Sequence, residues 1–216
     1  MTTLHIDFVS DVSCPWCAVG LWALEGALTR LAPEGITADI HCQPFELNPH
    51  MGPGGQDITE HLSEKYGSTA EQQAQIRDTI RQRGADVGFE FNRDGRGRIY
   101  NTFDAHRLLH WAGAEHPHLE LPLKKALLAA CHRNRQAMDT HAVLQQVAVD
   151  VGLDGTRASA VLASGEFEAE VRERQAFYAA QGIRSVPAVV VNHRHLISGG
   201  QPMAVFEQAL RQIASA

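Results

Sequence analysis

Hydrophobic and polar residues alternate along two stretches near the N-terminus, and a stretch with helical spacing separates them. Residues 4–12 are rich in Ile, Phe and Val, and residues 36–45 carry apolar side chains at every second position. A period of two is typical of β-strands, so both stretches are predicted to be strands. From Cys17 to Leu31 apolar residues recur at spacings of three and four, which predicts one helix that ends before a proline and a glycine.

The middle of the chain is predicted to be almost entirely helical. After a loop rich in Gly and Pro at residues 48–57, helical spacing dominates residues 58–180, apart from a short interruption near residues 87–95. The period of two then returns in residues 183–192 and 195–198, and a last amphipathic helix follows. The predicted order is therefore β-α-β, a long helical block, and β-β-α.

This order predicts an α/β protein with a thioredoxin-like fold (βαβ…ββα) and a large all-helical insertion domain. Residues 1–56 and 181–216 would form the discontinuous thioredoxin-like domain, and residues 57–180 would form the helical insertion domain. Because the insertion leaves the sheet between its two halves, it can lie above the start of the first helix. There it would form a wall or a lid.

Composition and charge exclude several classes of protein. The chain has 216 residues, with 19 Lys and Arg against 25 Asp and Glu, so its net charge is -6. A mildly acidic chain offers no basic face, so we expect neither nucleic acid nor a membrane as a partner. Its apolar runs are far shorter than the roughly 18–20 residues of a membrane span. The first residues show no basic and apolar leader, and we therefore expect a cytoplasmic location.

Cys14 and Cys17 form a C-x-x-C motif where the first strand leads into the first helix. Unpaired N–H groups and the positive end of the helix dipole stabilise a thiolate there, which lowers the thiol pKa. The pattern predicts dithiol–disulfide exchange, with Cys14 as the nucleophile and Cys17 as the thiol that resolves the mixed disulfide. Trp16 lies between them near the exposed helix start, and is a candidate contact for an apolar part of the substrate.

Other interpretations of the motif stay open. A lone C-x-x-C can supply half of a tetrahedral zinc site, but a second half is then required. Cys42 and Cys131 are isolated, so they are expected to be buried bystanders and no metal site is expected. The pair could also be inert, although a reducing cytoplasm favours a redox role. His193 and His195 lie on a predicted hairpin and are expected to be solvated.

The dipeptide Val186-Pro187 opens the last predicted strand pair. In a thioredoxin-like sheet, the position that faces the cysteine pair is a proline at the start of such a strand. A cis peptide bond at this point leaves the backbone of the preceding residue free to pair with an extended substrate. Pro187 is therefore predicted to be a cis-proline of the catalytic site, and Val186 to bind substrate. An ordinary proline of an edge strand is the alternative.

Several motifs spread over nearly the whole chain occur together. They are DVSCPWC (11–17) with Gly20, PFELNP (44–49), KYG (65–67), NTFDAHRL (101–108), GIRSVP (182–187) and ISGGQ (197–201). In this combination the sequence resembles the DsbA-like thioredoxin family, and in particular its FrnE-like branch of cytoplasmic oxidoreductases. The resemblance implies a thioredoxin fold with a helical insertion and dithiol–disulfide exchange through the Cys14–Cys17 pair. It requires no cofactor besides that disulfide.

The resemblance also implies partners and substrate-binding residues. The insertion segment from Asn101 to His106 would face the active site, and both residues are expected to bind substrate. Phe45 is expected to shape the loop beside the cysteine pair. The expected partners are protein thiols or disulfides, or a small thiol such as glutathione, and a homodimer stays open.

The same fold hosts an alternative function. The kappa-class glutathione transferases and the 2-hydroxychromene-2-carboxylate isomerases also have it, and resemblance to them implies a Ser where this chain has Cys14. The presence of both Cys14 and Cys17 argues against that function. A glutathione-dependent enzyme that acts on a small organic substrate stays the alternative.

Overall fold

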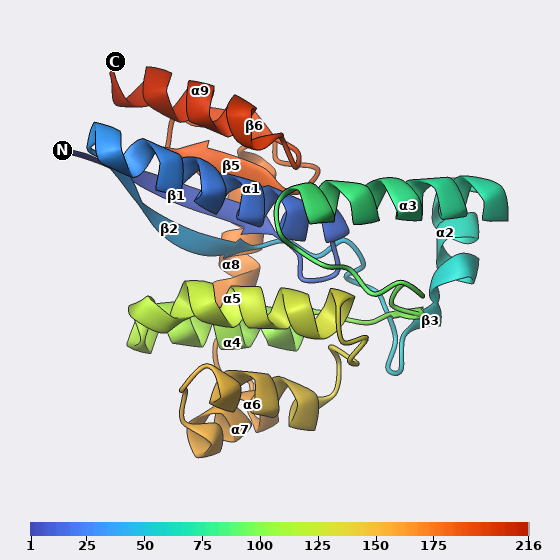
Figure 1. The fold of residues 1–216 in the computed structure, drawn as a ribbon. Helices are drawn as coiled ribbons and strands as arrows, with labels where there is room; N and C mark the ends of the chain where they lie inside the picture. Colours follow the sequence, from blue (N-terminus) through green and yellow to red (C-terminus); the bar gives the residue numbers. More distant parts are fainter. Residues whose placement is uncertain (216) are drawn as a thin grey trace.

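The central sheet has four strands in the order β2-β1-β5-β6. The structure, a computed structural model, describes residues 1–215 (Figure 1). β1 pairs in parallel with β2, and β5 pairs antiparallel with both β1 and β6. The strands are β1 (Thr2–Ser10), β2 (Ile36–Pro44), β5 (Ala188–Val191) and β6 (His195–Ser198). This arrangement confirms the predicted thioredoxin-like fold.

Helix α1 (Pro15–Leu31) connects the parallel strands β1 and β2. Pro15 occupies its first turn, where a missing N–H costs no intrahelical hydrogen bond. A short 3₁₀ turn, η1 (Ala32–Glu34), follows the helix, and Gly35 then adopts a left-handed conformation with φ 80°. Only glycine takes this conformation without steric cost, so the chain reverses there and enters β2.

The two faces of the sheet are covered by different parts of the chain. α1 and α9 (Met203–Ala214) lie on one side (Figure 1). There the strand residues Ile6, Phe8 and Val189 belong to the same apolar core as side chains of these two helices. α4 (Phe103–Glu115) and α5 (Pro117–His132) lie on the other side, and α6 (His141–Asp150) and α7 (Gly155–Ala163) lie beyond them (Figure 1). The alternation along β1 explains this layering, because successive side chains of a strand point to opposite faces.

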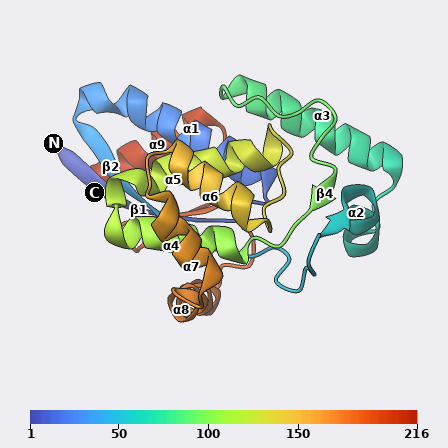
Figure 2. The same ribbon diagram turned by 90° about the horizontal axis from the view of Figure 1, so that it is seen from below.

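Residues 57–180 are mostly helical, as the periodicity predicts. The helices are α2 (Ile58–Tyr66), α3 (Ala70–Asp86), α4 (Phe103–Glu115), α5 (Pro117–His132), α6 (His141–Asp150), α7 (Gly155–Ala163) and α8 (Glu168–Ala180). α3 begins with a capping box between Thr69 and Gln72, which satisfies two backbone N–H groups. Figure 2 shows α2 and α3 set to one side of the group formed by α4, α5, α6 and α7.

Two details differ from the prediction. β3 (Gln56–Asp57) and β4 (Arg98–Ile99) pair as a small antiparallel ribbon, so the middle of the chain is not entirely helical. β5 is also shorter than the predicted strand over residues 183–192. Pro187 has no N–H to donate to a sheet, and the strand begins directly after it. In residues 1–215 no helix is both long and apolar enough to cross a membrane.

Candidate active site

Cys14 occupies the N-cap position of α1, at the junction that the sequence predicts. Its backbone N–H donates to the Asp11 carbonyl oxygen at 3.1 Å, and the Cys17 N–H donates to the Cys14 carbonyl oxygen at 3.1 Å. Both cysteines are free thiols. The Cys14 side chain is 4% exposed, whereas Cys17 is completely buried. Cys14 is therefore the thiol of the pair that a partner can reach.

The surroundings of the two thiols separate their acidities. A hydrogen bond from the Cys17 thiol lowers the pKa of Cys14, burial opposes this effect, and the N–H groups of Cys17 and Trp16 lower the pKa further. The negative charge of Asp11 raises the pKa of Cys14. Burial raises the pKa of Cys17 well above its ordinary value, and the interaction with Cys14 adds to this. Cys14 is thus the thiol that ionises first.

The loop before β5 faces Cys14. The Val186–Pro187 peptide bond is cis, and the Cys14 Sγ lies 3.6 Å from the Val186 carbonyl oxygen. Two glycines allow this close approach. A Cβ on Gly20 would lie 3.0 Å from the Pro187 Cγ, and a Cβ on Gly200 would lie 2.9 Å from the Trp16 carbonyl oxygen. Both contacts are too tight for a larger residue without movement of the neighbouring backbone or ring.

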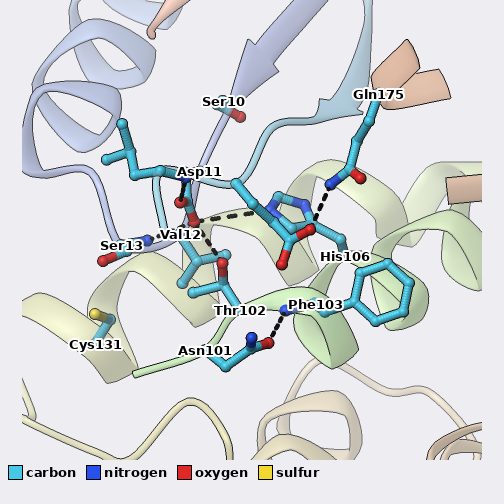
Figure 3. Close-up of polar contacts among 12 residues, drawn as sticks. Ser10, Asp11, Val12, Ser13, Asn101, Thr102, Phe103, His106, Cys131 and Gln175 are labelled. Atoms are coloured by element: carbon cyan, nitrogen blue, oxygen red, sulfur yellow. Dashed lines mark hydrogen bonds and ion pairs between the residues drawn. The ribbon is translucent and has the colours of Figure 1, made fainter. Parts of the chain in front are cut away.

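Asp11 is a buried carboxylate three residues before Cys14, and it joins three segments of the chain (Figure 3). Its Oδ1 accepts from the Ser13 N–H at 3.0 Å and from the Thr102 hydroxyl at 2.8 Å, and its Oδ2 accepts from the Leu47 N–H at 2.7 Å. The His106 Nε2 lies 3.7 Å from Oδ1. Burial raises the pKa of Asp11, but the interactions with His106 and the backbone N–H groups outweigh it and hold the pKa at about 2.

Three residues of the loop between β1 and α1 are held by side chains from residues 96–132. Asp11 accepts from Thr102, the Val12 carbonyl oxygen lies 2.9 Å from the His132 Nε2, and Arg96 donates to the carbonyl and hydroxyl oxygens of Ser13. Burial lowers the pKa of His132 to about 3, so its imidazole is neutral and donates this hydrogen bond. The insertion therefore fixes the backbone that presents Cys14.

A pocket of about 450 Å³ opens beside Cys14 and extends toward α2 and α3. Its walls are mostly apolar, and several of the side chains that form them are Trp16, Leu62, Tyr66, Ile76 and Ile80. Three arginines also line it, Arg77, Arg81 and Arg96, together with Asp94. A substrate in this pocket would place apolar groups against the helices and acidic groups near the arginines.

The predicted substrate-binding residues fall into two groups. Trp16 and Val186 line the pocket. His106, at 2% exposed, lies beneath the site beside Asp11. Asn101 lies two residues before α4, and its Oδ1 accepts from the Phe103 N–H at the start of the helix (Figure 3). Phe45 packs against a small apolar cluster. In this structure these last three residues support the loops behind the site and do not line the pocket.

Lys124 is a feature of the site that the sequence analysis does not single out. Its side chain on α5 is fully buried, and its Nζ has no hydrogen-bond partner among residues 1–215. The positive charge lowers the pKa of Cys17 against the effect of burial. The charge of Lys124 also lowers the pKa of Glu120, but burial outweighs it and raises this pKa to about 7. The spacing of Lys124 from the apolar residues Leu123, Leu127 and Leu128 places it on the buried face, and this is the signal that could have found it.

Comparisons with known proteins agree with the fold. Residues 5–211 match the model of the DSBA-like thioredoxin domain. A probable DsbA oxidoreductase of Streptomyces coelicolor is 32% identical, with 97% of this chain and 89% of that chain covered and a TM-score of 0.86.

Two further solved structures share the fold at lower identity. A 2-hydroxychromene-2-carboxylate isomerase is 16% identical, with 97% and 95% of the two chains covered and a TM-score of 0.68. The cytosolic disulfide reductase DsbM of Pseudomonas aeruginosa, solved with glutathione, is also 16% identical, with both chains fully covered and a TM-score of 0.65. At this identity the likeness shows the fold alone.

Proposed function

The chain belongs to the family of DSBA-like thioredoxin domains, and on this premise we propose that it is a thiol–disulfide oxidoreductase. The observation that carries the proposal is Cys14, which occupies the N-cap position of α1 and whose thiol has a lowered pKa and lies against the loop of Val186 and Pro187. A lowered pKa increases the fraction of thiolate at neutral pH and makes the sulfur a better leaving group. The proposal needs no cofactor besides the cysteine pair.

In the proposed reaction the Cys14 thiolate attacks one sulfur of a substrate disulfide. A mixed disulfide forms, and the other substrate sulfur leaves as a thiolate that takes up a proton. Cys17 then loses its proton and attacks the Cys14 sulfur, which forms the Cys14–Cys17 disulfide and releases the second substrate sulfur as a thiol. Two electrons pass from the protein to the substrate. The reverse sequence oxidises a dithiol, and the redox poise of the partner sets the direction.

Substrate recognition rests on the backbone of Val186 and on the pocket beside Cys14. An extended segment that pairs with the Val186 backbone would bring its sulfur next to Cys14, while its apolar side chains enter the pocket beside Trp16. Protein thiols or disulfides fit this arrangement. A small thiol such as glutathione fits as well, because its carboxylates could face the arginines of the pocket.

The cellular setting is part of the proposal. We propose a cytoplasmic location, and the name of DsbM as a cytosolic reductase is in line with it. A reducing compartment favours a catalytic role for an unpaired C-x-x-C motif over a structural one. A homodimer stays a prediction.

Substitution of each of the two cysteines tests the function. Cys14→Ser is expected to abolish the acceleration that the protein gives to the reduction of insulin by dithiothreitol, because the attacking sulfur is lost. Cys17→Ser is expected to trap mixed disulfides on Cys14. Cys42→Ser is the matched control, because the raised pKa of this half-buried thiol, caused mainly by desolvation, leaves little thiolate for exchange. An unchanged insulin rate in Cys14→Ser would overturn the proposal.

The same variants distinguish the alternative function from the proposed one. A glutathione-dependent transferase or isomerase would bind glutathione after Cys17→Ser. It would also turn over an organic substrate without any change in the disulfide state of the protein. Loss of all activity in Cys14→Ser, with trapped mixed disulfides in Cys17→Ser, excludes that class.

A further inference from the structure

Two histidines and a buried aspartate converge on the sheet, away from the cysteine pair. The Asp7 Oδ2 lies 3.2 Å from the His5 Nε2 and 3.2 Å from the His193 Nδ1, and the three atoms all lie within 4.8 Å of one another. We propose that His5, Asp7 and His193 bind a divalent transition-metal ion of the zinc class. The sequence analysis expects no metal site, because the C-x-x-C motif lacks a second half, and it does not connect these three residues, which come from opposite ends of the chain.

The separations between the three ligand atoms fit such an ion. Zinc binds nitrogen and oxygen ligands at about 2.0–2.2 Å in tetrahedral geometry, which places neighbouring ligand atoms about 3.3–3.6 Å apart. The two distances of 3.2 Å from the Asp7 Oδ2 are already close to this value. A rotation of the exposed His193 side chain can adjust the remaining distance, because this side chain is 71% exposed.

The backbone arrangement brings the ligands together. His5 and Asp7 are two residues apart on β1 and therefore point to the same face of the sheet. His193 lies in the turn between β5 and β6. Asn192 fixes this turn to β1, since its N–H donates to the His5 carbonyl oxygen at 2.8 Å and its Oδ1 accepts from the His5 N–H at 3.0 Å. The turn is thus held over Asp7.

A second layer of contacts orients the ligands, as is common at metal sites. Asp7 is 4% exposed, and its Oδ1 accepts from the Gln43 Nε2 at 2.8 Å, which leaves Oδ2 for the two imidazoles. The His5 ring is stacked on the His41 ring, with 4.6 Å between the centroids.

The donor set selects the class of ion. Two imidazoles and one carboxylate suit zinc, cobalt, nickel and copper, whereas magnesium and calcium prefer sites made of oxygen alone. The exposed side of His193 leaves the fourth position to water. The bound ion would link β1, which leads to Cys14, with the hairpin that begins after Pro187. It would therefore stabilise the frame of the active site by binding the folded state alone.

Zinc titration of a full-length variant without the redox thiols tests the proposal. Cys14→Ser/Cys17→Ser is the background, because a thiolate pair binds zinc by itself. Calorimetry with ZnCl₂ is expected to show one equivalent bound, with no heat from MgCl₂ under the same conditions. Asp7→Asn and His193→Asn, each added to this background, are expected to weaken binding by at least roughly tenfold. His118→Ala removes an exposed histidine elsewhere and is expected to leave binding unchanged.

Thermal unfolding supplies a second measurement. Zinc is expected to raise the Tm of the background variant and to leave the Tm of the His193→Asn variant unchanged. Asn tolerates the left-handed backbone of residue 193, where φ is 56°, so this variant keeps the turn even if Asp7→Asn fails to fold. A purely structural cluster, held by hydrogen bonds alone, predicts no saturable zinc binding. That result, or equal binding by the His193→Asn variant, overturns the proposal.

Discussion

The thiol sulfur of Cys14 lies 3.6 Å from the carbonyl oxygen of Val186, although 172 positions separate the two residues in the sequence. Cys14 is brought there by the start of α1, and Val186 by the loop before β5. The insertion holds the loop that precedes Cys14 through Asp11, Val12 and Ser13. The Cys14 thiol is therefore positioned by both halves of the thioredoxin-like fold and by residues 96–132 between them.

The pKa values of Cys14 and Cys17 are expected to be shifted in opposite directions. The pKa of Cys14 lies below its ordinary value of 9.0, mainly because of the hydrogen bond from the Cys17 thiol, whereas burial raises the pKa of Cys17. Alkylation by iodoacetamide should therefore occur first at Cys14, with a midpoint below pH 9. Cys17→Ala should raise this midpoint, because it removes the hydrogen bond. The thiolate absorbance at 240 nm, followed against pH, measures both midpoints. Equal midpoints in the wild type and in Cys17→Ala would contradict this account of the Cys14 pKa.

Asp11→Asn is expected to destabilise the protein at neutral pH and less so in acid. The pKa of the carboxyl falls from 3.8 to about 2 on folding, so the charged form contributes about 2 kcal/mol of stability above pH 4. This contribution is lost as the pH falls through about 2. Urea unfolding of both proteins at pH 7 and near pH 2 measures the difference. The destabilisation should shrink in acid, and a constant difference would argue against a charged Asp11.

The same substitution separates the charge of Asp11 from its structural role. Its negative charge raises the pKa of Cys14, so Asp11→Asn should lower that pKa further. Thr102→Val is the matched control. It removes the hydroxyl that donates to Asp11 at 2.8 Å and keeps the carboxylate charge. It should therefore destabilise the loop without lowering the pKa of Cys14.

Lys124→Met is expected to slow the second step of exchange. The buried charge lowers the pKa of Cys17, so its removal leaves Cys17 more fully protonated. A change of about 1 kcal/mol in this charge interaction corresponds to a roughly fivefold slower attack at pH 7. The measurement is the release of thionitrobenzoate from its mixed disulfide with Cys14. Lys125→Met is the control, because Lys125 is partly exposed and pairs with Glu25. Equal rates in both variants would contradict a role for Lys124.

Gly200→Ala is expected to disturb the first turn of α1. The added Cβ would lie 2.9 Å from the Trp16 carbonyl oxygen, and such overpacking costs about 1–3 kcal/mol. Gly52→Ala, where a Cβ meets nothing within 4 Å, should change neither stability nor activity. Thermal unfolding and the insulin assay compare the two variants. A Gly200→Ala protein with unchanged stability and rate would show that the turn can move.

Most of the frame could be predicted from the sequence, because it rests on local patterns. The period of two in β1 and β2 and the apolar face of α1 set these elements. The cysteine motif marked the start of α1, and the proline marked the loop before β5. The short ribbon of β3 and β4 escaped prediction because two-residue strands leave no period to detect.

The contacts behind the site could not be predicted in the same way, because they join distant segments. Asp11 meets Thr102 across the insertion, and Asp7 meets His193 across the sheet. Nothing in the sequence around any of these residues indicates its partner. The depth of His106 is a similar case, since its motif gives no sign that the side chain is buried beside Asp11 and away from the pocket. The division into a discontinuous domain (1–56 and 181–216) and an insertion domain (57–180) stays a prediction.

The residues between β2 and β5 also delay the synthesis of Val186 after that of Cys14. A ribosome that adds about 5–20 residues per second needs roughly 10–30 s to reach Val186 after it has made Cys14. During this interval the growing chain carries the nucleophilic cysteine without the loop that covers it in the finished protein. A nascent chain of this kind depends on the reducing power of its surroundings to keep Cys14 from pairing with a passing thiol.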